Sequence, residues 1–367
     1  MTRTMVAAAV AAALLTVAPA LTPAADAAQP EASAASPLTE SSTAVVAPDG
    51  KPGLTLYTGP VQLHRGTAWV PVNLTLTAAG DGTVRPLASP QDLLLTPAGP
   101  QVRFATGGGT ALDWPTVLPA PTLDGPRATY AQAAPGYDLV VEATSAGFMA
   151  SLRRAGAPPA APVPPLALRG KVDGATAEGM PTAVGESAVD YVVAAAPPAG
   201  PTPAPFDTTV QETVQYSDTS GQPDLRVGTY DGKDVARSFL TFDASGLAKR
   251  PVTRATLSLF QTWSSSCQAR SWEVWSAAGA GPATRWTNQP ALQKLWASST
   301  DTRGHEPACA AGWTTVDVTD LVRSWSDTGA PTGTVALRAS DETDTLAWKR
   351  FGSAESATVP HLDVTFG

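Results

Sequence analysis

Short runs of alternating apolar and polar residues dominate the second half of the chain. Along 254–260 every second residue is apolar, namely Ala255, Leu257 and Leu259, and the same alternation returns at the end of the chain over 360–367. Successive side chains of a β-strand point to opposite faces, so these runs predict strands with one buried face. Turn residues separate them, which favours an antiparallel sandwich. Further strands are expected at 207–215, 224–228 and 237–243.

One stretch of this half has a helical period instead. Val318, Leu321, Val322 and Trp325 are spaced i, i+3, i+4 and i+7, and Gly329 follows the last of them. This pattern predicts a short helix that ends near the glycine. We expect the helix to cover an edge or an open end of the sandwich.

The first half also consists of short alternating runs, bounded by Gly, Pro, Asp or Asn. Clear examples are 54–57, 68–76, 137–143 and 188–194. They predict a separate all-β module over residues 51–196. A proline-rich linker follows at 197–205, and it marks a boundary to a second module at 206–367.

The N-terminus reads as a secretory signal peptide over residues 1–28. Arg3 precedes an Ala/Val/Leu run from Val6 to Ala18, and small residues suited to cleavage follow. The apolar run is shorter than the roughly 20 residues of a membrane helix. We therefore expect a secreted, extracellular protein without a membrane span. Residues 29–50 are mostly Ala, Ser, Thr and Pro, which predicts a disordered lead-in.

Composition narrows the possible partners. The formal net charge of −8 over 367 residues disfavours nucleic acid, whose phosphates attract clustered Lys and Arg. The 35 prolines and 31 glycines favour turns over long helices. Together with the abundant alanine they suggest a GC-rich genome, and hence an actinobacterial source.

The chain contains two cysteines, Cys267 and Cys309, both in the second module. An even number of cysteines in an exported chain predicts a disulfide bond. A zinc site or a redox dithiol is the alternative, but the second ligand pair and the C-x-x-C spacing that these require are absent from the sequence.

Residues 206–367 resemble the DNRLRE domain of secreted actinobacterial proteins, also described as carbohydrate-binding module family 96. The resemblance rests on the segments 207–210, 225–228, 237–243, 255–259, 284–290, 313–325, 351–355 and 360–366. It implies a jelly-roll-like antiparallel β-sandwich and, as in some relatives, polysaccharide binding. The chain departs from the family at 217–221, where the family often has Asn-x-Gly, and no ligand residue transfers. The first module resembles the β-rich segment that precedes this domain in secreted proteins with RHS repeats or LamG domains.

Eight of the ten tryptophans lie between Trp263 and Trp348. Indole rings can pack against the C–H face of a sugar ring, or they can fill a sandwich core. Strand parity separates two of them, because Trp272 shares a face with Val274 whereas Trp275 lies on the opposite face. Trp263, Trp275 and Trp348 are the aromatic candidates for ligand contact.

A polar cluster adds three candidates, Asp341, Glu342 and Arg350. They could bind sugar hydroxyls or uronate carboxylates, or they could form a solvated loop. Structural calcium is a further possibility, although its candidate ligands lack the regular D-x-D-x-D-G spacing. These ligands are Asp218, Asp224, Asp231 and Asp234. No other cofactor is indicated.

Sequence motifs for catalysis are absent. His305-Glu306 lacks the second histidine of H-E-x-x-H, and the chain contains neither G-x-S-x-G nor G-x-x-x-x-G-K. The leading hypothesis is a secreted, non-catalytic protein that binds polysaccharide or a cell-surface glycan through its second module. A structural or interaction module of an RHS-type surface system is the alternative. A polysaccharide-cleaving enzyme is third, since a glycosidase needs just two carboxyl groups.

Overall fold

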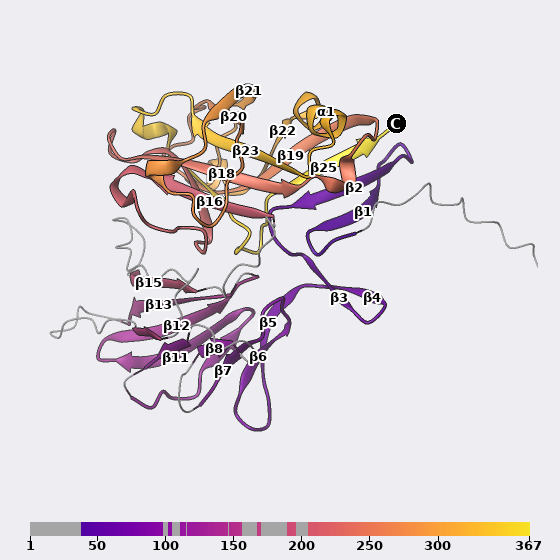
Figure 1. Ribbon diagram of the computed structural model, residues 1–367. Coiled ribbons are helices and arrows are strands. Elements are labelled where there is room, and N and C mark those ends of the chain that lie inside the picture. The colour runs from indigo at the N-terminus through magenta and orange to yellow at the C-terminus, as the bar shows by residue number, and fades with distance from the viewer. Residues whose placement is uncertain are drawn as a thin grey trace, which may run out of the picture. The chain divides into compact units, whose positions relative to one another are not determined.

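The computed structural model describes residues 38–97, 102–104, 111–114, 116–145, 147–155, 167–169, 189–195 and 205–367 (Figure 1). Strands dominate these ranges, and the expected all-β class is confirmed. The expected signal peptide, residues 29–37 of the lead-in and nearly all of the proline-rich linker lie outside the described residues. No helix within the described ranges is both long and apolar enough to span a bilayer.

The second module contains two antiparallel sheets. In the first sheet, β19 is central and pairs with β25 and β24 on one side and with β22 on the other. Its strands are β17 (Asp224–Thr229), β19 (Val252–Ser264), β22 (Gly312–Asp317), β24 (Lys349–Gly352) and β25 (His361–Phe366).

The second sheet has the strand order β16-β18-β23-β20-β21. Its strands are β16 (Phe206–Gln211), β18 (Val235–Asp243), β20 (Trp272–Ala277), β21 (Leu292–Ser299) and β23 (Thr332–Ala339). β17 pairs with β24 of the first sheet and, through Gly228 and Thr229, with β18 of the second. Gly228 has φ +98, which favours glycine at this corner, where the chain passes from one sheet to the other.

One hydrophobic core lies between the two sheets. Leu257 and Leu259 come from the first sheet, and Phe242, Trp272 and Leu337 come from the second. All five are fully buried, as the alternation along their strands predicts. The two sheets thus form the expected sandwich.

The expected helix is α1 (Thr319–Thr328), which packs against β19 and β23. Leu321, Val322 and Trp325 join the core of the sandwich. Gly329 ends the helix in the left-handed conformation, and its N–H donates to the last helical carbonyls. Gly333 on β23 makes room for the helix, because a Cβ there would overlap the ring of Trp325.

A hairpin from the start of the chain completes the first sheet. It consists of β1 (Ser42–Val46) and β2 (Pro52–Tyr57), and β2 pairs with β25 at the edge of the sheet. Leu54 and Leu56 enter the sandwich core. The disorder expected over 29–50 is therefore wrong for residues 42–46, because β1 pairs with β2, which is itself held by the distant strand β25.

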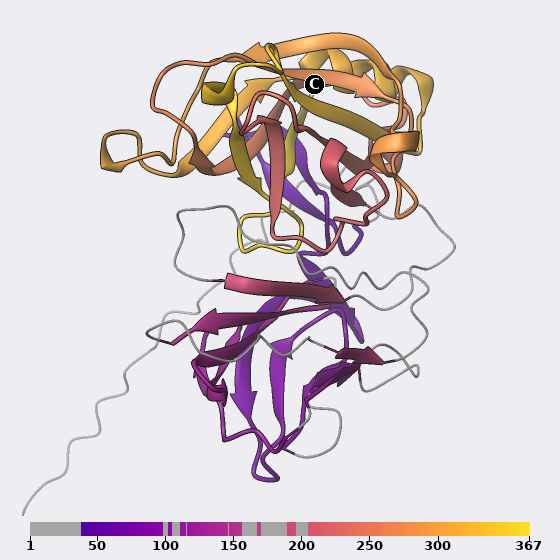
Figure 2. The same cartoon turned by 90° about the vertical axis from the view of Figure 1, so that its left-hand side faces the viewer.

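Thirteen further strands lie between the hairpin and β16 (Figure 2). One sheet has the order β14-β9-β8-β7-β6-β5, another has the order β10-β11-β12-β13-β15, and β3 pairs with β4. Residues of both large sheets share a second core, which includes Leu76, Val102, Leu139 and Leu152. The strands are β3 (Gln62–Arg65), β4 (Ala68–Pro71), β5 (Asn73–Ala78), β6 (Val84–Ala88), β7 (Leu93–Leu95), β8 (Val102–Phe104), β9 (Ala111–Asp113), β10 (Thr122–Asp124), β11 (Arg127–Ala134), β12 (Tyr137–Ala143), β13 (Phe148–Arg154), β14 (Ala167–Arg169) and β15 (Val189–Ala195).

Short 3-10 helices lie between strands of the second module. They are η1 (Glu212–Val214), η2 (Ser245–Leu247), η3 (Trp286–Asn288), η4 (Pro307–Cys309) and η5 (Thr345–Ala347). The disulfide between Cys267 and Cys309 is confirmed, with a Cα–Cα distance of 5.7 Å. It ties the loop after β19 to η4.

Candidate functional site

A row of charged side chains crosses the outer face of the second sheet. The pairs Ser238–Leu337 and Glu273–Arg338 set the register of β18, β23 and β20. This register places Arg237 next to Arg338, and Arg338 next to Glu273, all on the face away from the sandwich core. Three adjacent strands therefore present three planar, charged side chains to solvent.

An apolar layer lies beside this row on the same face. Val210, Phe239 and Ala336 are buried there, outside the main core. The half-buried rings of Trp275 on β20 and Trp286 on η3 pack against them. This second cluster supports both indoles from below, so they lie on a rigid base.

Glu342 holds the charged row together. Its two carboxylate oxygens accept hydrogen bonds from Nε and Nη2 of Arg237, each at 2.7 Å. Arg237 also donates through Nη1 to Gln289, at 3.1 Å. Nε of Arg338 lies 3.4 Å from Glu273, and the indole N–H of Trp275 donates to the same carboxylate at 2.8 Å. A longer ion pair, 3.9 Å from Arg338 to Glu342, links these two groups of charged and aromatic side chains.

The arginines also lie over the two indoles. The guanidinium carbon of Arg237 is 5.3 Å from the ring centroid of Trp286, and that of Arg338 is 6.0 Å from the ring centroid of Trp275. Both distances are within the range of cation–π attraction. We call Arg237, Arg338, Glu273, Glu342 and Trp275 the Arg–Trp face.

The network leaves donors available for a ligand. Nη2 of Arg338 is 3.9 Å from Glu342, too far for a hydrogen bond, and a guanidinium carries five N–H groups. The four charged side chains keep between 15 and 25 % of their surface exposed, so a ligand can reach them. Two arginines and two glutamates give the face no net charge, which suits neutral hydroxyl groups.

A shallow hollow lies in the loop that carries Trp286. Its volume is about 350 Å³, and it lies between β20 and β21 along the chain. The residues that line it are small or polar: Ala278, Gly279, Gly281, Pro282, Ala283, Thr284, Asn288 and Pro290. Its lining combines backbone polar groups with the apolar surface of alanine and proline side chains.

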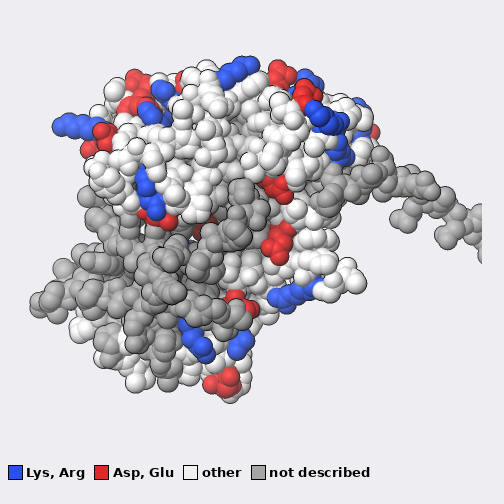
Figure 3. All heavy atoms as spheres, in the orientation of Figure 1, with Lys and Arg blue, Asp and Glu red and all other residues white. Residues whose placement is uncertain are grey.

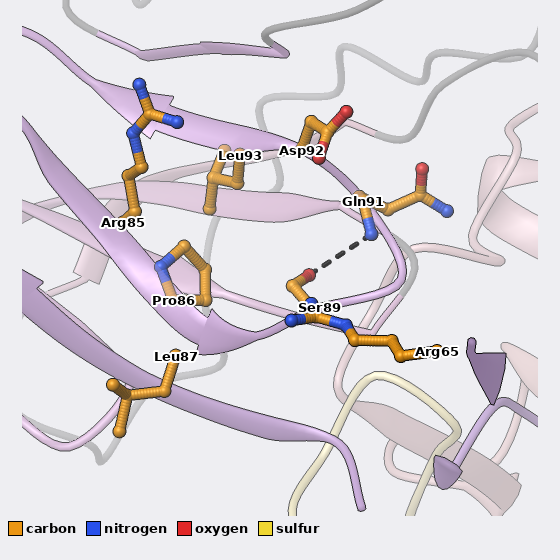
Figure 4. A pocket seen from close by; sticks show the side chains of 8 residues that line it. All are labelled: Arg65, Arg85, Pro86, Leu87, Ser89, Gln91, Asp92 and Leu93. Atoms are coloured by element: carbon orange, nitrogen blue, oxygen red, sulfur yellow. Dashed lines mark hydrogen bonds between the residues drawn. The ribbon is translucent and has the colours of Figure 1, made fainter. Parts of the chain in front are cut away.

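A second hollow, of about 230 Å³, lies in the first module (Figure 4). Arg65 of β3 and Arg85 of β6 line it together with Ser89, Gln91 and Asp92. The Ser89 hydroxyl accepts a hydrogen bond from the N–H of Gln91, which fixes the turn at its rim. Elsewhere, Figure 3 shows Lys and Arg interspersed with Asp and Glu over the described residues in view.

The aromatic and arginine candidates for ligand contact lie in different parts of the second module. Trp275 lies on the Arg–Trp face, and Trp272 is buried in the core, as strand parity predicts. Trp263 and Arg350 lie on the first sheet, with the guanidinium carbon 5.4 Å from the ring centroid. Trp348 is 3 % exposed, with its ring against Tyr230, so the expected ligand contact is wrong for this residue: its ring is enclosed by protein.

The two acidic candidates also separate. Glu342 belongs to the Arg–Trp face. Asp341 is exposed, and its carboxylate accepts hydrogen bonds from the N–H and the hydroxyl of Thr343. Asp341 therefore caps its own loop and takes no part in the network.

The four aspartates proposed as calcium ligands do not form a common site. Asp218 lies 3.3 Å from Arg285, and Asp224 pairs with Arg226 at 3.1 Å. Asp231 accepts hydrogen bonds from neighbouring backbone N–H groups, and Asp234 accepts them from Gln211 and Thr213. Across the described ranges, no three Asp, Glu, His or Cys side chains come together as a metal site.

Sequence reasoning did not single out Arg237, Arg338, Glu273, Trp286 or Gln289. Strand parity could have placed Arg237 on the outer face, because Leu240 and Phe242 occupy the inner face of the same strand. The register that joins β18, β23 and β20 could not be predicted, because it depends on pairing between distant segments.

Among the comparisons with known proteins, a family model matches the second module. No curated protein matches the chain. Among solved structures, the K3 cleaved adhesin domain of Lys-gingipain from Porphyromonas gingivalis W83 is 13 % identical and has a TM-score of 0.18; the match covers 47 % of this chain and 81 % of that one. Residues 201–366, which span β16 to β25, match the model of carbohydrate-binding module family 96. The second module is therefore similar to a family of carbohydrate-binding modules.

Proposed function

We propose that the chain is a secreted, non-catalytic protein that binds polysaccharide through the Arg–Trp face. The match of residues 201–366 to a carbohydrate-binding family supports the class of ligand. The observation that carries the proposal is the network in which Glu342 and Glu273 hold Arg237 and Arg338 beside the indole of Trp275.

The chemistry of the face suits a sugar. Guanidinium N–H groups donate to sugar hydroxyls, carboxylates accept from them, and the indole packs against ring C–H groups. The side chains are already fixed by one another, so little side-chain entropy is lost when a ligand binds. The balance of charge favours neutral sugar units over uronates.

The carboxylates of the face serve as partners of arginine. A glycosidase requires a carboxylic acid that protonates the leaving group and a second carboxylate on the other side of the bond. Glu342 is bidentate to Arg237, and Glu273 lies between Arg338 and the Trp275 indole. Both carboxylates are therefore occupied by ion pairs and hydrogen bonds within the face, which favours binding over hydrolysis.

Affinity electrophoresis of the full chain tests the proposal. The gels contain neutral, uronate and cell-wall polysaccharides in turn, and we expect retarded migration in at least one neutral polymer. Arg338→Gln removes the charge but keeps a polar side chain, and we expect it to abolish most of the retardation. Arg103→Gln, at an exposed position on β8, is the matched control. Equal migration of the parent chain with and without every polymer would refute the function and favour the interaction-module alternative.

A further inference from the structure

Four aromatic side chains line up across the outer face of the first sheet. The pairs Tyr57–His361 and Phe260–Trp313 belong to the ladders between β2 and β25 and between β19 and β22. β25 pairs with β19 through His361 and Ser258, so the four strands are neighbours. We call Tyr57, His361, Trp313 and Phe260 the aromatic row.

The rings of the aromatic row contact one another in sequence. The centroid distances are 5.5 Å from Tyr57 to His361, 4.9 Å from His361 to Trp313 and 5.5 Å from Trp313 to Phe260. On β19, Ser258 pairs with His361 on one side and with Thr315 on the other, and it is 5 % exposed.

Trp313 is exposed although its neighbours hold it in place. It keeps 42 % of its surface accessible, whereas core residues of the first sheet are almost fully buried. Phe260 and His361 pack against it in edge-to-face geometry, at 81° and 65°. Such contacts restrict the side-chain rotamer, so the exposed indole is positioned before any ligand arrives.

The groups around the row are polar. The Asp363 carboxylate is 51 % exposed, lies 3.6 Å from Nε2 of His361 and accepts a hydrogen bond from the Thr55 hydroxyl. Thr315 and Asp317 are exposed next to Trp313 on β22. An apolar protein partner would bury these carboxylates without compensation. A neutral sugar has a C–H face for the indole and hydroxyls that can donate to the carboxylates.

We propose that the aromatic row is a second saccharide-binding site, with neutral sugar units as its ligand. The inference rests on the proposed function for the class of ligand, but it concerns a different surface. The Arg–Trp face and the aromatic row lie on the outer faces of two sheets that enclose one core. They point away from each other, so the sandwich binds two polymer strands and cross-links them.

The hairpin makes this site particular to the chain. Tyr57 belongs to β2, outside the stretch 201–366 that matches the carbohydrate-binding family. Pairing of β2 with β25 adds a strand beyond His361 and extends the row by one ring. The N-terminal hairpin therefore contributes to the binding surface as well as to the core.

Isothermal titration of the full chain with a short oligosaccharide from the retained polymer tests the inference. We expect two sugar-binding sites in the parent chain. Trp313→Ala and Trp275→Ala should each retain one site. Trp313→Phe keeps a ring and should retain the second site. Because Trp313 is exposed, thermal melting should show that Trp313→Ala stays folded.

Mixing with the intact polymer gives a second readout. We expect the parent chain to produce turbid networks and each single variant to lose them, with apparent affinity for the polymer falling about tenfold or more as bivalency is lost. A single site in the parent chain that Trp275→Ala removes and Trp313→Ala leaves unchanged would overturn the inference and leave the proposed function intact. A single site in the parent chain that Trp313→Ala removes and Trp275→Ala leaves unchanged would instead overturn the assignment of binding to the Arg–Trp face.

Discussion

The Thr58 hydroxyl donates a hydrogen bond to the buried carboxylate of Asp207 at 2.7 Å. Thr58 follows the N-terminal hairpin and Asp207 lies on β16, so the bond joins segments 149 residues apart. The N–H of Ala354, in the loop between β24 and β25, donates to the same oxygen at 2.8 Å. One carboxylate thus fastens three segments of the sandwich.

The contribution of this carboxylate to the stability of the fold depends on pH. Burial raises the pKa of Asp207 to about 7. Burial and the charge of Asp207 together raise the pKa of the nearby Glu355 well above its usual range. The folded state therefore binds more protons than the unfolded state between about pH 4 and pH 7, and stability falls as pH rises through this window.

Asp207→Asn should remove the part of that pH dependence that comes from Asp207 itself. The amide oxygen still accepts from Thr58, and no charge has to be buried. We expect the variant to be more stable than the parent chain at pH 8, by roughly 2–4 kcal/mol, and about equal to it at pH 4. Urea unfolding at both pH values measures the difference, and the same difference at pH 4 and pH 8 would contradict the account.

The hairpin should stabilise the sandwich. Leu56 on β2 is 2 % exposed in the main core. We expect Leu56→Ala to lower the free energy of unfolding of the full chain by about 3 kcal/mol, because it leaves a cavity. Val46→Ala, at an exposed position of β1, is the control and should change little. Equal, small effects of both substitutions would show that the hairpin does not belong to the folded core.

Lys349 provides a second pH test of opposite sign. Its side chain is fully buried, and its ammonium donates to the Thr302 hydroxyl at 2.9 Å. Burial lowers the pKa of Lys349 to about 8. Between about pH 8 and pH 10.5 the unfolded state binds more protons, so the penalty for burying the charge fades as pH rises.

Lys349→Met should therefore increase the stability of the fold most at low pH. We expect its stability relative to the parent chain to be higher at pH 7 than at pH 10, by about 2 kcal/mol. Denaturant unfolding of both proteins at the two pH values checks this, and a relative stability that does not change with pH would be evidence against a depressed pKa.

The disulfide should stabilise the fold without forming the binding face. Cys267 and Cys309 are 42 residues apart, and removal of such a cross-link costs about 4 kcal/mol in the chain-entropy model. We expect the double Cys→Ser variant to melt at a lower temperature but to keep its affinity for polysaccharide at 20 °C or below. Loss of affinity in a variant shown to be folded would mean that the disulfide loop is part of the site.

Local patterns predicted the fold class well. The period-2 runs, the i, i+3, i+4, i+7 spacing at Val318–Trp325 and the opposite faces of Trp272 and Trp275 are all set by neighbours in sequence. The pairing of two cysteines was also within reach, since the chain contains no others.

Long-range pairing could not be predicted in the same way. Tyr57 meets His361 across about 300 residues, and Arg237 meets Glu342 across 105. Trp348 was a candidate for ligand contact, but it is 3 % exposed and its ring packs against Tyr230. In each case the outcome depends on which strands become neighbours, which a single alternating run does not specify.

The most direct test of the central claim compares the polysaccharide affinity of the full chain with that of Trp275→Ala. The account predicts that the parent chain binds a neutral polysaccharide and that Trp275→Ala weakens binding about tenfold or more, while remaining folded. Trp69→Ala, at a half-buried tryptophan on β4 outside the family match, should bind as the parent chain does. Equal affinity of all three proteins would contradict the assignment of binding to the Arg–Trp face.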